Sequence, residues 1–481
     1  MKDHQPEIVN FGCRLNAYES EVIKEHATKA GLKNVVVINS CAVTSEAERQ
    51  VRQRIRKIKR NNPSLKIVVT GCAAQVKPKE FAAMAEVYAV VGNAEKMKIE
   101  TYSKLFEGMV DEAQTIAQTN EPKAVTGYDA KSGVDNGESI KADEEEGQKE
   151  QEEGQEKEQE ARILVNDIMS IKDTAMHLVD GFEGKVRGFL QVQNGCNHRC
   201  TFCIIPYGRG NSRSVPLGDI VTQAQKLVDS GCKELVLTGV DITDYGLDLP
   251  GTPRLGQMVK RLLRMVPNLP RLRLSSIDVA EIDEDMLWLI QNEERFMPHL
   301  HLSLQSGDNM ILKRMKRRHT REQVIEFCEN VRRLRPGVVF GADIIAGFPT
   351  ETDEMFENSF NLIKETKIIH LHVFPYSERS GTPAARMPQV KHEVRKIRAE
   401  RLRELGHELQ SEHYRHLIGQ VVEVLYEGGG KGRTRDYSIV RLDSGGEEIE
   451  GVLSRDRLIM CKIVDVLSQN QPEVEMVGVL S

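Results

Sequence analysis

The sequence predicts an α/β protein built from three parts: an N-terminal Rossmann-like parallel α/β domain, a partial (β/α)6 barrel and a small C-terminal antiparallel β-barrel. Short β-branched runs alternate with helical patterns through residues 1–109 and again through 171–412. The tail, 413–481, instead has short alternating strands separated by Gly-rich turns. A chain of 481 residues is long enough for about three such domains.

In the N-terminal part, each of three apolar runs is followed closely by a cysteine. The runs are 8–11 before Cys13, 35–39 before Cys41 and 67–71 before Cys72. A helical pattern follows each cysteine, which indicates a βα alternation and a parallel sheet. Because ligands bind at the carboxyl ends of parallel strands, we expect the three cysteines to converge at that edge.

Residues 110–170 form an acidic, low-complexity segment. Positions 138–160 alone contain eleven acidic residues and three lysines, so the rest of the chain is slightly basic although the net charge is −6. This composition buries too little apolar surface to form a core, so we expect a flexible, largely disordered linker or insertion. A solvated helix through 142–165 is the alternative.

The central part contains six apolar runs separated by helical patterns. They are 189–193, 234–238, 271–275, 299–304, 338–345 and 368–374. Six βα units fit a partial parallel barrel better than the full eight. Polar residues end several runs and are expected to face the barrel mouth, namely Gln193, Thr238, Ser276, Gln305 and Asp343.

The nine cysteines favour metal binding or catalysis over a disulfide framework, because their number is odd and no secretory leader is visible. No apolar run approaches the ~20 residues of a membrane span. We therefore expect a cytoplasmic protein with no membrane partner. Cys232, Cys328 and Cys461 lie in apolar surroundings and are expected to be packing residues.

Cys196, Cys200 and Cys203 follow the first barrel strand with the spacing Cys-x3-Cys-x2-Cys. A structural zinc site or an ordinary iron–sulfur cluster uses four protein ligands. Three thiolates on so short a loop can hold three corners of a 4Fe–4S cluster and leave the fourth iron open to a substrate. The alternative is a Cys3His zinc site that includes His198.

The loop CNHRCTFCIIPYGRG resembles the cluster loop of the radical S-adenosylmethionine (SAM) methylthiotransferases. The N-terminal segments FGCRLNAYES, NSCAVTSEAERQVRQ and TGCAAQ are similar to that family's first domain. The segments LTGVDITDYG, LRLSSIDVAEID, HLHLSLQSGDNMILKRMKRRHT and GADIIAGFPTET are similar to its barrel. The resemblance covers about 1–105 and 170–415, and the C-terminus resembles more weakly the family's RNA-binding TRAM domain.

The resemblance implies two 4Fe–4S clusters, one on Cys196, Cys200 and Cys203 and an auxiliary one on Cys13, Cys41 and Cys72. It also implies that SAM serves as both methyl donor and radical source. The six cysteines are then the catalytic residues. We expect further contacts to SAM from residues at the strand ends, namely Thr238, Gly239, Asp241, Ser276, Gln305 and Asp343.

Within the family, the residues GCRLN around Cys13 resemble the branch that methylthiolates N6-threonylcarbamoyladenosine at position 37 of tRNA, next to the anticodon. The branches acting on isopentenyladenosine in tRNA or on a ribosomal-protein aspartate are the first alternatives. An iron–sulfur RNA-binding protein without catalysis is the second.

Basic residues are expected to contact tRNA phosphates, and two tyrosines near the mouth are candidates for base stacking. These residues are Arg52, Arg56 and Arg317 for phosphates, and Tyr207 and Tyr376 for stacking. The resemblance further implies an anticodon stem-loop as partner, an electron-donor protein and a sulfur source. We expect the protein to be a monomer.

Overall fold

The computed structural model describes residues 5–119, 160, 162–172, 186–443, 458–467 and 474–480. The chain divides into two compact units. The first contains Met1–Gly12, Val22–Ala42 and Glu46–Ile168. The second contains Met169–Ser481 together with Cys13–Glu21 and Val43–Ser45, so the start of the first helix is grouped with the barrel.

The first unit contains a parallel five-stranded sheet in the order β1-β2-β3-β4-β5. Its strands are β1 Glu7–Asn10, β2 Val35–Ser40, β3 Lys66–Gly71, β4 Ala89–Val91 and β5 Ile163–Leu164. Every residue of β2 is buried, which explains its unbroken β-branched sequence. The expected Rossmann-like sheet is therefore present, with its strands in sequence order.

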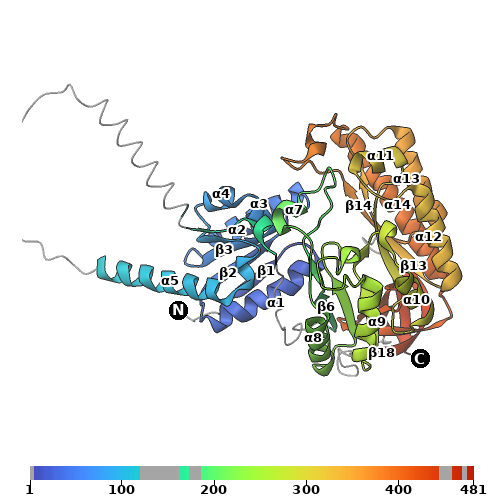
Figure 1. Cartoon of the computed structure of the whole chain (residues 1–481), viewed down its shortest axis with the longest axis horizontal. Helices are drawn as coiled ribbons and strands as arrows, with labels where there is room; N and C mark the ends of the chain where they lie inside the picture. The colour runs from blue at the N-terminus through green and yellow to red at the C-terminus, as the bar shows by residue number, and fades with distance from the viewer. Residues whose placement is uncertain are drawn as a thin grey trace, which may run out of the picture. The chain divides into compact units, whose positions relative to one another are not determined.

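Helices connect these strands: α1 Arg14–Lys29, α2 Ser45–Asn61, α3 Cys72–Val76, α4 Pro78–Ala82 and α5 Ile99–Thr119 (Figure 1). Helix α2 is held to its unit by Val51, Ile55 and Ile58, which are buried at helical spacing. Its many lysines and arginines occupy the remaining positions, so an amphipathic pattern accounts for most of its charge.

The structure extends the first unit into the segment expected to be a linker. Helix α5 continues to Thr119, and β5 pairs in parallel with β4 through Val90 and Ile163. A two-residue strand gives too weak a periodicity to be recognised, so β5 was not expected from the sequence. The alternative of a solvated helix at 142–165 falls mostly outside the described residues.

The second unit contains the six expected barrel strands. They are β6 Arg187–Gln191, β9 Glu234–Thr238, β10 Arg271–Leu274, β12 His299–Gln305, β13 Val339–Ala346 and β14 His370–Pro375. All adjacent pairs among them are parallel; β6, β9 and β10 form one sheet, and β12, β13 and β14 form another with the short β11, Ser276–Ile277. A two-stranded ribbon, β7 Gln193–Asn194 with β8 Arg213–Ser214, follows β6.

Helices follow these strands and cover the outside of the sheets (Figure 1). They are α7 Ile205–Arg209, α8 Leu217–Asp229, α9 Leu255–Met265, α10 Glu284–Asn292, α11 Asn309–Met315, α12 Arg321–Leu334, α13 Asp353–Thr366 and α14 His392–His416. Side chains cap the N-termini of several of these helices. Asp308 accepts hydrogen bonds from the backbone amides of Met310 and Ile311 at the start of α11, and Thr320 accepts one from the amide of Gln323 at the start of α12.

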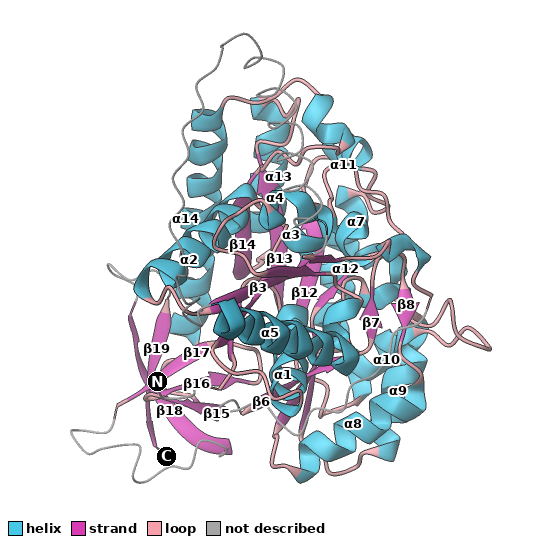
Figure 2. Cartoon of the chain, turned by 90° about the vertical axis from the view of Figure 1, so that its left-hand side faces the viewer, coloured by secondary structure: helices cyan, strands magenta, loops and turns pink. Residues whose placement is uncertain are grey.

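The C-terminal strands close into a barrel in the order β15-β16-β17-β19-β18 (Figure 2). They are β15 Val421–Gly428, β16 Lys431–Thr434, β17 Ile439–Leu442, β18 Leu458–Leu467 and β19 Glu475–Leu480. Four pairs are antiparallel, as expected, but β17 and β19 are parallel. A closed ring of five strands requires at least one parallel pair, because strand direction cannot alternate around an odd number.

Helix α14 is held to this barrel by a buried aromatic and an ion pair. Tyr414 lies in the core of the small barrel, and its hydroxyl accepts a hydrogen bond from the Ile439 amide at 3.2 Å. His413 Nε2 lies 2.9 Å from Asp436 Oδ2. Among the described residues, no helix is long and apolar enough to span a membrane.

We expect Asp436→Asn to lower the free energy of unfolding by about 1–3 kcal/mol at pH 7, because it weakens a partly buried hydrogen bond between the carboxylate and His413. Burial alone would raise the pKa of Asp436, but His413 and Thr434 outweigh it and the pKa is lowered. The stabilisation is therefore complete above the unfolded-state pKa of about 4 and is lost only as the pH falls further.

Thermal unfolding monitored by circular dichroism would measure this effect. Glu412→Gln, at an exposed position beside His413 on the same helix, is the matched control. Equal melting temperatures for the two variants at pH 7 would contradict the assignment.

Candidate active site at the barrel mouth

The three-cysteine loop begins where β7 ends. One side chain, that of Gln193, ties it to the loop that follows β9. Gln193 donates from Nε2 to the carbonyl of Gly195 at 2.8 Å and to Ser212 Oγ at 2.9 Å. Its Oε1 accepts from the amides of Val240 and Asp241 at 3.0 and 2.9 Å. Gln193 is completely buried and thereby fixes the cysteine loop against the loop that follows β9.

Two glycines make this arrangement possible. A Cβ at Gly239 would lie 2.8 Å from Gln193 Oε1, and one at Gly195 would lie 1.8 Å from the Asn211 carbonyl oxygen. Gly195 also has φ +73°, a left-handed conformation that suits glycine. Gly239, expected from the sequence to contact SAM, therefore has a clear packing requirement as well.

The middle of the loop is held from two other elements. Thr201 donates from its amide to the Met315 carbonyl at 3.1 Å and from its hydroxyl to the Arg314 carbonyl at 2.8 Å. The Thr201 carbonyl accepts from the Ala384 amide at 2.9 Å. Further on, Arg209 is buried and pairs with Glu19 at 2.8 Å, so two motifs far apart in sequence meet within the second unit.

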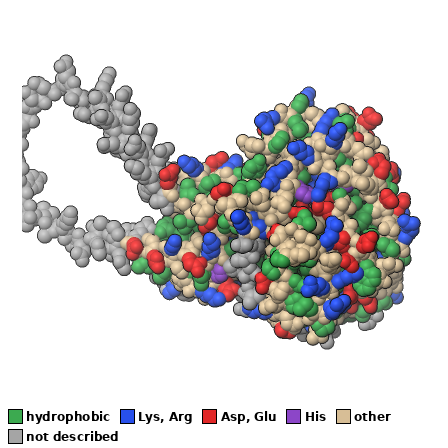
Figure 3. All heavy atoms as spheres, in the orientation of Figure 1, with side chains coloured by type: hydrophobic (Ala, Val, Ile, Leu, Met, Phe, Trp, Pro, Cys, Tyr) green, Lys and Arg blue, Asp and Glu red, His purple; other side chains and the backbone are tan. Residues whose placement is uncertain are grey.

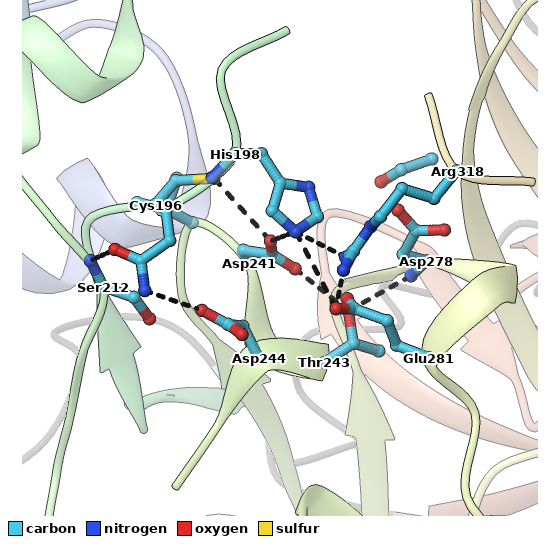
Figure 4. Close-up of polar contacts among 12 residues, drawn as sticks. Cys196, His198, Ser212, Asp241, Thr243, Asp244, Asp278, Glu281 and Arg318 are labelled. Atoms are coloured by element: carbon cyan, nitrogen blue, oxygen red, sulfur yellow. Dashed lines mark hydrogen bonds and ion pairs between the residues drawn. The ribbon is translucent and has the colours of Figure 1, made fainter. Parts of the chain in front are cut away.

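His198 and Asp241 lie beside the first thiol (Figure 4). Cys196 Sγ is 3.6 Å from Asp241 Oδ2, and His198 Nε2 is 3.4 Å from the same oxygen and 3.7 Å from Glu281. Hydrogen bonds with Cys200 and Glu281 raise the pKa of His198 to about 10. Burial and the nearby Asp241 carboxylate raise the pKa of the Cys196 thiol.

Cys200 has the opposite electrostatic environment. Burial alone would raise the pKa of its thiol, but hydrogen bonds from His198 and Arg317 outweigh burial and lower the pKa. Arg317 lies 3.8 Å from Cys200 Sγ, and it is held there by Asp278 at 2.9 Å and the Ser303 carbonyl at 2.6 Å. A guanidinium fixed beside a thiolate favours the ionised form that binds iron.

The inward position of Arg317 corrects the expectation that it contacts tRNA phosphates. Its side chain is only 8% exposed. In the same basic run, the half-buried Arg314 binds Thr350, and the exposed Arg318 pairs with Glu281 and His198. On the face shown in Figure 3, basic side chains are interspersed with acidic ones. Charge counts along a sequence cannot reveal such internal pairing.

A second group of expected residues lines a cavity of about 220 Å³ in the second unit. Its lining includes Gln305 and Asp343, expected to bind SAM, and Tyr376, expected to stack on a base. Val43 and Thr44 contribute from the short segment grouped with this unit. Gln305 has φ +71°, an unusual conformation for a non-glycine residue and one that often marks functional sites.

The remaining expected SAM contacts lie at the ends of other strands. Thr238 is the buried last residue of β9 and is paired with Gln191 of β6. Ser276 begins β11 and is paired with His301 of β12. The structure thus brings Gly239 and Asp241 beside the cysteine loop, and Gln305 and Asp343 into one cavity.

In the first unit, Cys41 and Cys72 follow the neighbouring strand ends Ser40 and Gly71, which are paired in register. Both cysteines are buried, and Asn93 lies 3.7 Å from Cys72 Sγ. A Cβ at Gly71 would lie 2.3 Å from the Ser40 carbonyl oxygen, so only glycine permits this approach. Cys13, which follows β1 by three residues, is exposed and grouped with the second unit.

The other expected RNA contacts have mixed surroundings. Arg52 pairs with Glu80 at 2.6 Å, whereas Arg56 is exposed. Tyr207 is 55% exposed and does not line the cavity that contains Tyr376. Cys328 and Cys461 are completely buried and Cys232 is 8% exposed, in agreement with the packing role expected for them.

Sequence reasoning missed a layer of histidines inside the larger barrel. Asp343 Oδ1 lies 3.0 Å from His301 Nε2 and 3.2 Å from His372 Nδ1. His299 and His370 lie two residues before these histidines on the same strands. The repeated tripeptide His-Leu-His in β12 and β14 was the available signal, because residues i and i+2 of a strand share a face.

Two family models match the chain. The Radical SAM superfamily matches residues 190–363, and Uncharacterized protein family UPF0004 matches residues 6–92. The solved structure of the radical SAM methyltransferase TsrM from Kitasatospora setae aligns with a TM-score of 0.48 and 15% identity, covering 79% of this chain and 74% of that one.

The curated relatives define the group more narrowly. Threonylcarbamoyladenosine tRNA methylthiotransferase MtaB of Rickettsia prowazekii (strain Madrid E) is 52% identical over 91% of each chain. The Bacillus subtilis (strain 168) protein of the same name is 35% identical over 87% of this chain and 83% of its own. A tRNA-2-methylthio-N(6)-dimethylallyladenosine synthase of Ehrlichia canis (strain Jake) is 30% identical over 87% of each.

The parallel barrel with a three-cysteine loop after its first strand defines a radical SAM enzyme, whose cofactors are SAM and a 4Fe–4S cluster. Within that class, the chain belongs to the methylthiotransferase family. The donor set fits the cluster, because three soft thiols lie on one loop and a guanidinium lies beside Cys200. The donor atoms of Cys196, His198 and Asp241 also lie within 4.8 Å of one another, a donor set different from the Cys3His zinc alternative.

We expect Gln193→Leu to weaken iron retention without unfolding the protein, because it removes the hydrogen bonds that fix the cysteine loop against Val240 and Asp241. After anaerobic reconstitution, iron release to a chelator should be several-fold faster than in the unchanged protein. Gln225→Leu, on the outer helix α8, is the control. Identical release rates for the two variants would show that Gln193 does not support the site.

Proposed function

We propose that this protein is a tRNA methylthiotransferase that converts N6-threonylcarbamoyladenosine at position 37 to its 2-methylthio derivative. The observation that carries the proposal is the 52% identity over 91% of both chains with a relative named for threonylcarbamoyladenosine. The relatives named for dimethylallyladenosine are only 29–30% identical. This difference favours the same branch as the residues GCRLN around Cys13.

In this proposal, Cys196, Cys200 and Cys203 hold one 4Fe–4S cluster, and Cys13, Cys41 and Cys72 hold a second. When bound, the clusters and SAM supply radical cleavage of SAM and the sulfur chemistry of methylthiolation. The protein's own contribution is orientation. Gln193 positions the loop, Arg317 favours the Cys200 thiolate, and Asp241 lies where it can contact SAM beside Cys196.

The target adenine is proposed to enter the cavity lined by Gln305, Asp343 and Tyr376, with Tyr376 beneath the base. A base in an anticodon loop is already single-stranded, so its extrusion costs little. The C-terminal barrel and exposed residues such as Arg56 are proposed to bind phosphates of the stem. The reaction further requires an electron donor and a sulfur source, and we propose that the protein acts as a cytoplasmic monomer.

The two cysteine triads should be separable by iron analysis. Replacing Cys196, Cys200 and Cys203 by Ala should leave about four irons per chain and abolish SAM cleavage. Replacing Cys13, Cys41 and Cys72 should also leave about four irons, with SAM cleavage retained and no methylthio product. Zinc in place of iron, or unchanged iron in either triple variant, would overturn the two-cluster proposal.

The substrate can be identified with anticodon stem-loops that carry threonylcarbamoyladenosine, isopentenyladenosine or plain adenosine. We expect 2-methylthio product only on the first, detected by mass spectrometry of the released nucleosides. A ribosomal protein is included as a further acceptor. Product on the isopentenyl loop or the ribosomal protein, with none on the threonylcarbamoyl loop, would move the chain to another branch.

A further inference from the structure

A second cavity, of about 350 Å³, lies at the other end of the larger barrel from the cysteine loop, within the second unit. Its polar lining is mainly imidazole and guanidinium. The basic members are Arg14, Arg403, Arg433, His299, His301, His370, His372 and His407. Among the described residues that line it there is no aspartate or glutamate. We call this space the histidine–arginine cavity.

The cavity contains a buried polar side chain that lacks a partner. His299 is 3% exposed, and neither of its ring nitrogens has a hydrogen-bond partner in the described part of the chain. It stacks on Tyr437, with ring centroids 5.1 Å apart, and meets His370 edge-on at 5.2 Å. His370 Nε2 is likewise unpartnered. The other nitrogen of His370, Nδ1, lies 3.2 Å from Gln410 Nε2. Buried polar groups are nearly always paired, so three unpaired ring nitrogens on these two histidines indicate a ligand.

The surroundings of Tyr437 show that this region is electropositive. Four guanidinium groups lie over its ring at 4.3–5.6 Å from the centroid, namely those of Arg14, Arg187, Arg273 and Arg433. Burial alone would raise the pKa of Tyr437, but these arginines outweigh burial and lower it. Glu234 and Glu427 pair with Arg273 and Arg187. Arg14 and Arg403 line the cavity; Arg14 donates to the Tyr437 hydroxyl at 3.3 Å, and Arg403 pairs with the exposed Glu400 at 2.9 Å.

One layer of side chains connects this cavity to the proposed adenine site. Asp343 lines the mouth cavity, and its carboxylate binds His301 and His372, which line the histidine–arginine cavity. These histidines lower the pKa of Asp343 despite its burial, so its charge is matched locally. This hydrogen-bonded layer lies between the two cavities, so a group attached to a base in the mouth cavity would have to pass it to approach His299.

We propose that the histidine–arginine cavity is an anion subsite that takes the carboxylate of the N6-threonylcarbamoyl group on the target adenine. This inference rests on the proposed function. The cavity is near the lower end of ligand-pocket volumes, so it suits a substituent rather than a whole nucleotide. A carboxylate would accept hydrogen bonds from His299 and from the arginines, whereas an isopentenyl group offers no acceptor and would leave His299 unpaired.

The proposal is tested by removing the negative charge from the substrate and the positive charge from the cavity. The substrates are stem-loops carrying threonylcarbamoyladenosine or its carboxylate methyl ester. The proteins are the reconstituted holoenzyme and its Arg403→Gln, Arg433→Gln and Arg433→Lys variants. Arg401→Gln is the matched control, because Arg401 is exposed on the same helix and pairs with Glu357 outside the cavity.

We expect the unchanged enzyme to bind the acid about tenfold more tightly than the ester, measured without reductant so that no turnover occurs. This ratio should fall toward one in Arg403→Gln and Arg433→Gln, and it should be kept in Arg433→Lys and Arg401→Gln. A purely structural role for these arginines would weaken the acid and ester loops alike and leave the ratio unchanged.

Three outcomes would overturn the inference: equal binding of acid and ester by the unchanged enzyme, an unchanged ratio in both glutamine variants, or uniform weakening of every loop. The last would assign the arginines to a structural role or to contact with a backbone phosphate. Failure of the proposed function is a separate result, because it would appear as no methylthio product on the acid loop when reductant is supplied. Product formation with an unchanged ratio would reject the subsite alone.

Discussion

The larger barrel depends on one buried carboxylate, that of Glu234. Glu234 is the first residue of β9 and is paired in register with Arg187 of β6 and Arg271 of β10. Its oxygens lie 3.0 Å from Arg273 Nε and 3.8 Å from Arg271 Nη1. The arginines lower its pKa even though burial favours the neutral acid. Without this charge, guanidinium groups would be buried unpaired, at a cost of several kcal/mol.

The same arginines attach the C-terminal barrel. Arg271 also pairs with Glu423 at 2.6 Å, Arg187 with Glu427 at 3.0 Å, and Arg273 donates to the Arg435 carbonyl at 3.1 Å. The small barrel is therefore a structural part of the second unit, since it completes the partners of groups buried in β10. Its Tyr437 and Arg433 also form one wall of the histidine–arginine cavity. The domain proposed to bind RNA thus also supplies partners for charges buried in the larger barrel.

The parts of the fold that the sequence predicted are those with strong periodicity or spacing. The six barrel strands and the parallel N-terminal sheet follow from local patterns, whereas Asp241 was expected to contact SAM only through the family resemblance. The missed features depend on long-range pairing. Strand β5 has only two residues, and Arg317 lies in a run that looks like a phosphate-binding patch but is paired with Asp278. The unpaired state of His299 depends on β14 and the C-terminal barrel, so β12 alone could not reveal it.

The clamping of Thr201 has a consequence for how the enzyme matures. The loop between Cys196 and Cys203 is shaped by backbone hydrogen bonds to Met315 and Ala384 and by the Gln193 side chain, and none of these involves a thiol. Chain entropy is therefore lost when the barrel folds rather than when iron arrives. The contacts that shape this receptor are all within the protein, so folding does not have to wait for metal loading. A zinc-finger peptide follows the reverse order, because its metal must bind before the chain can fold.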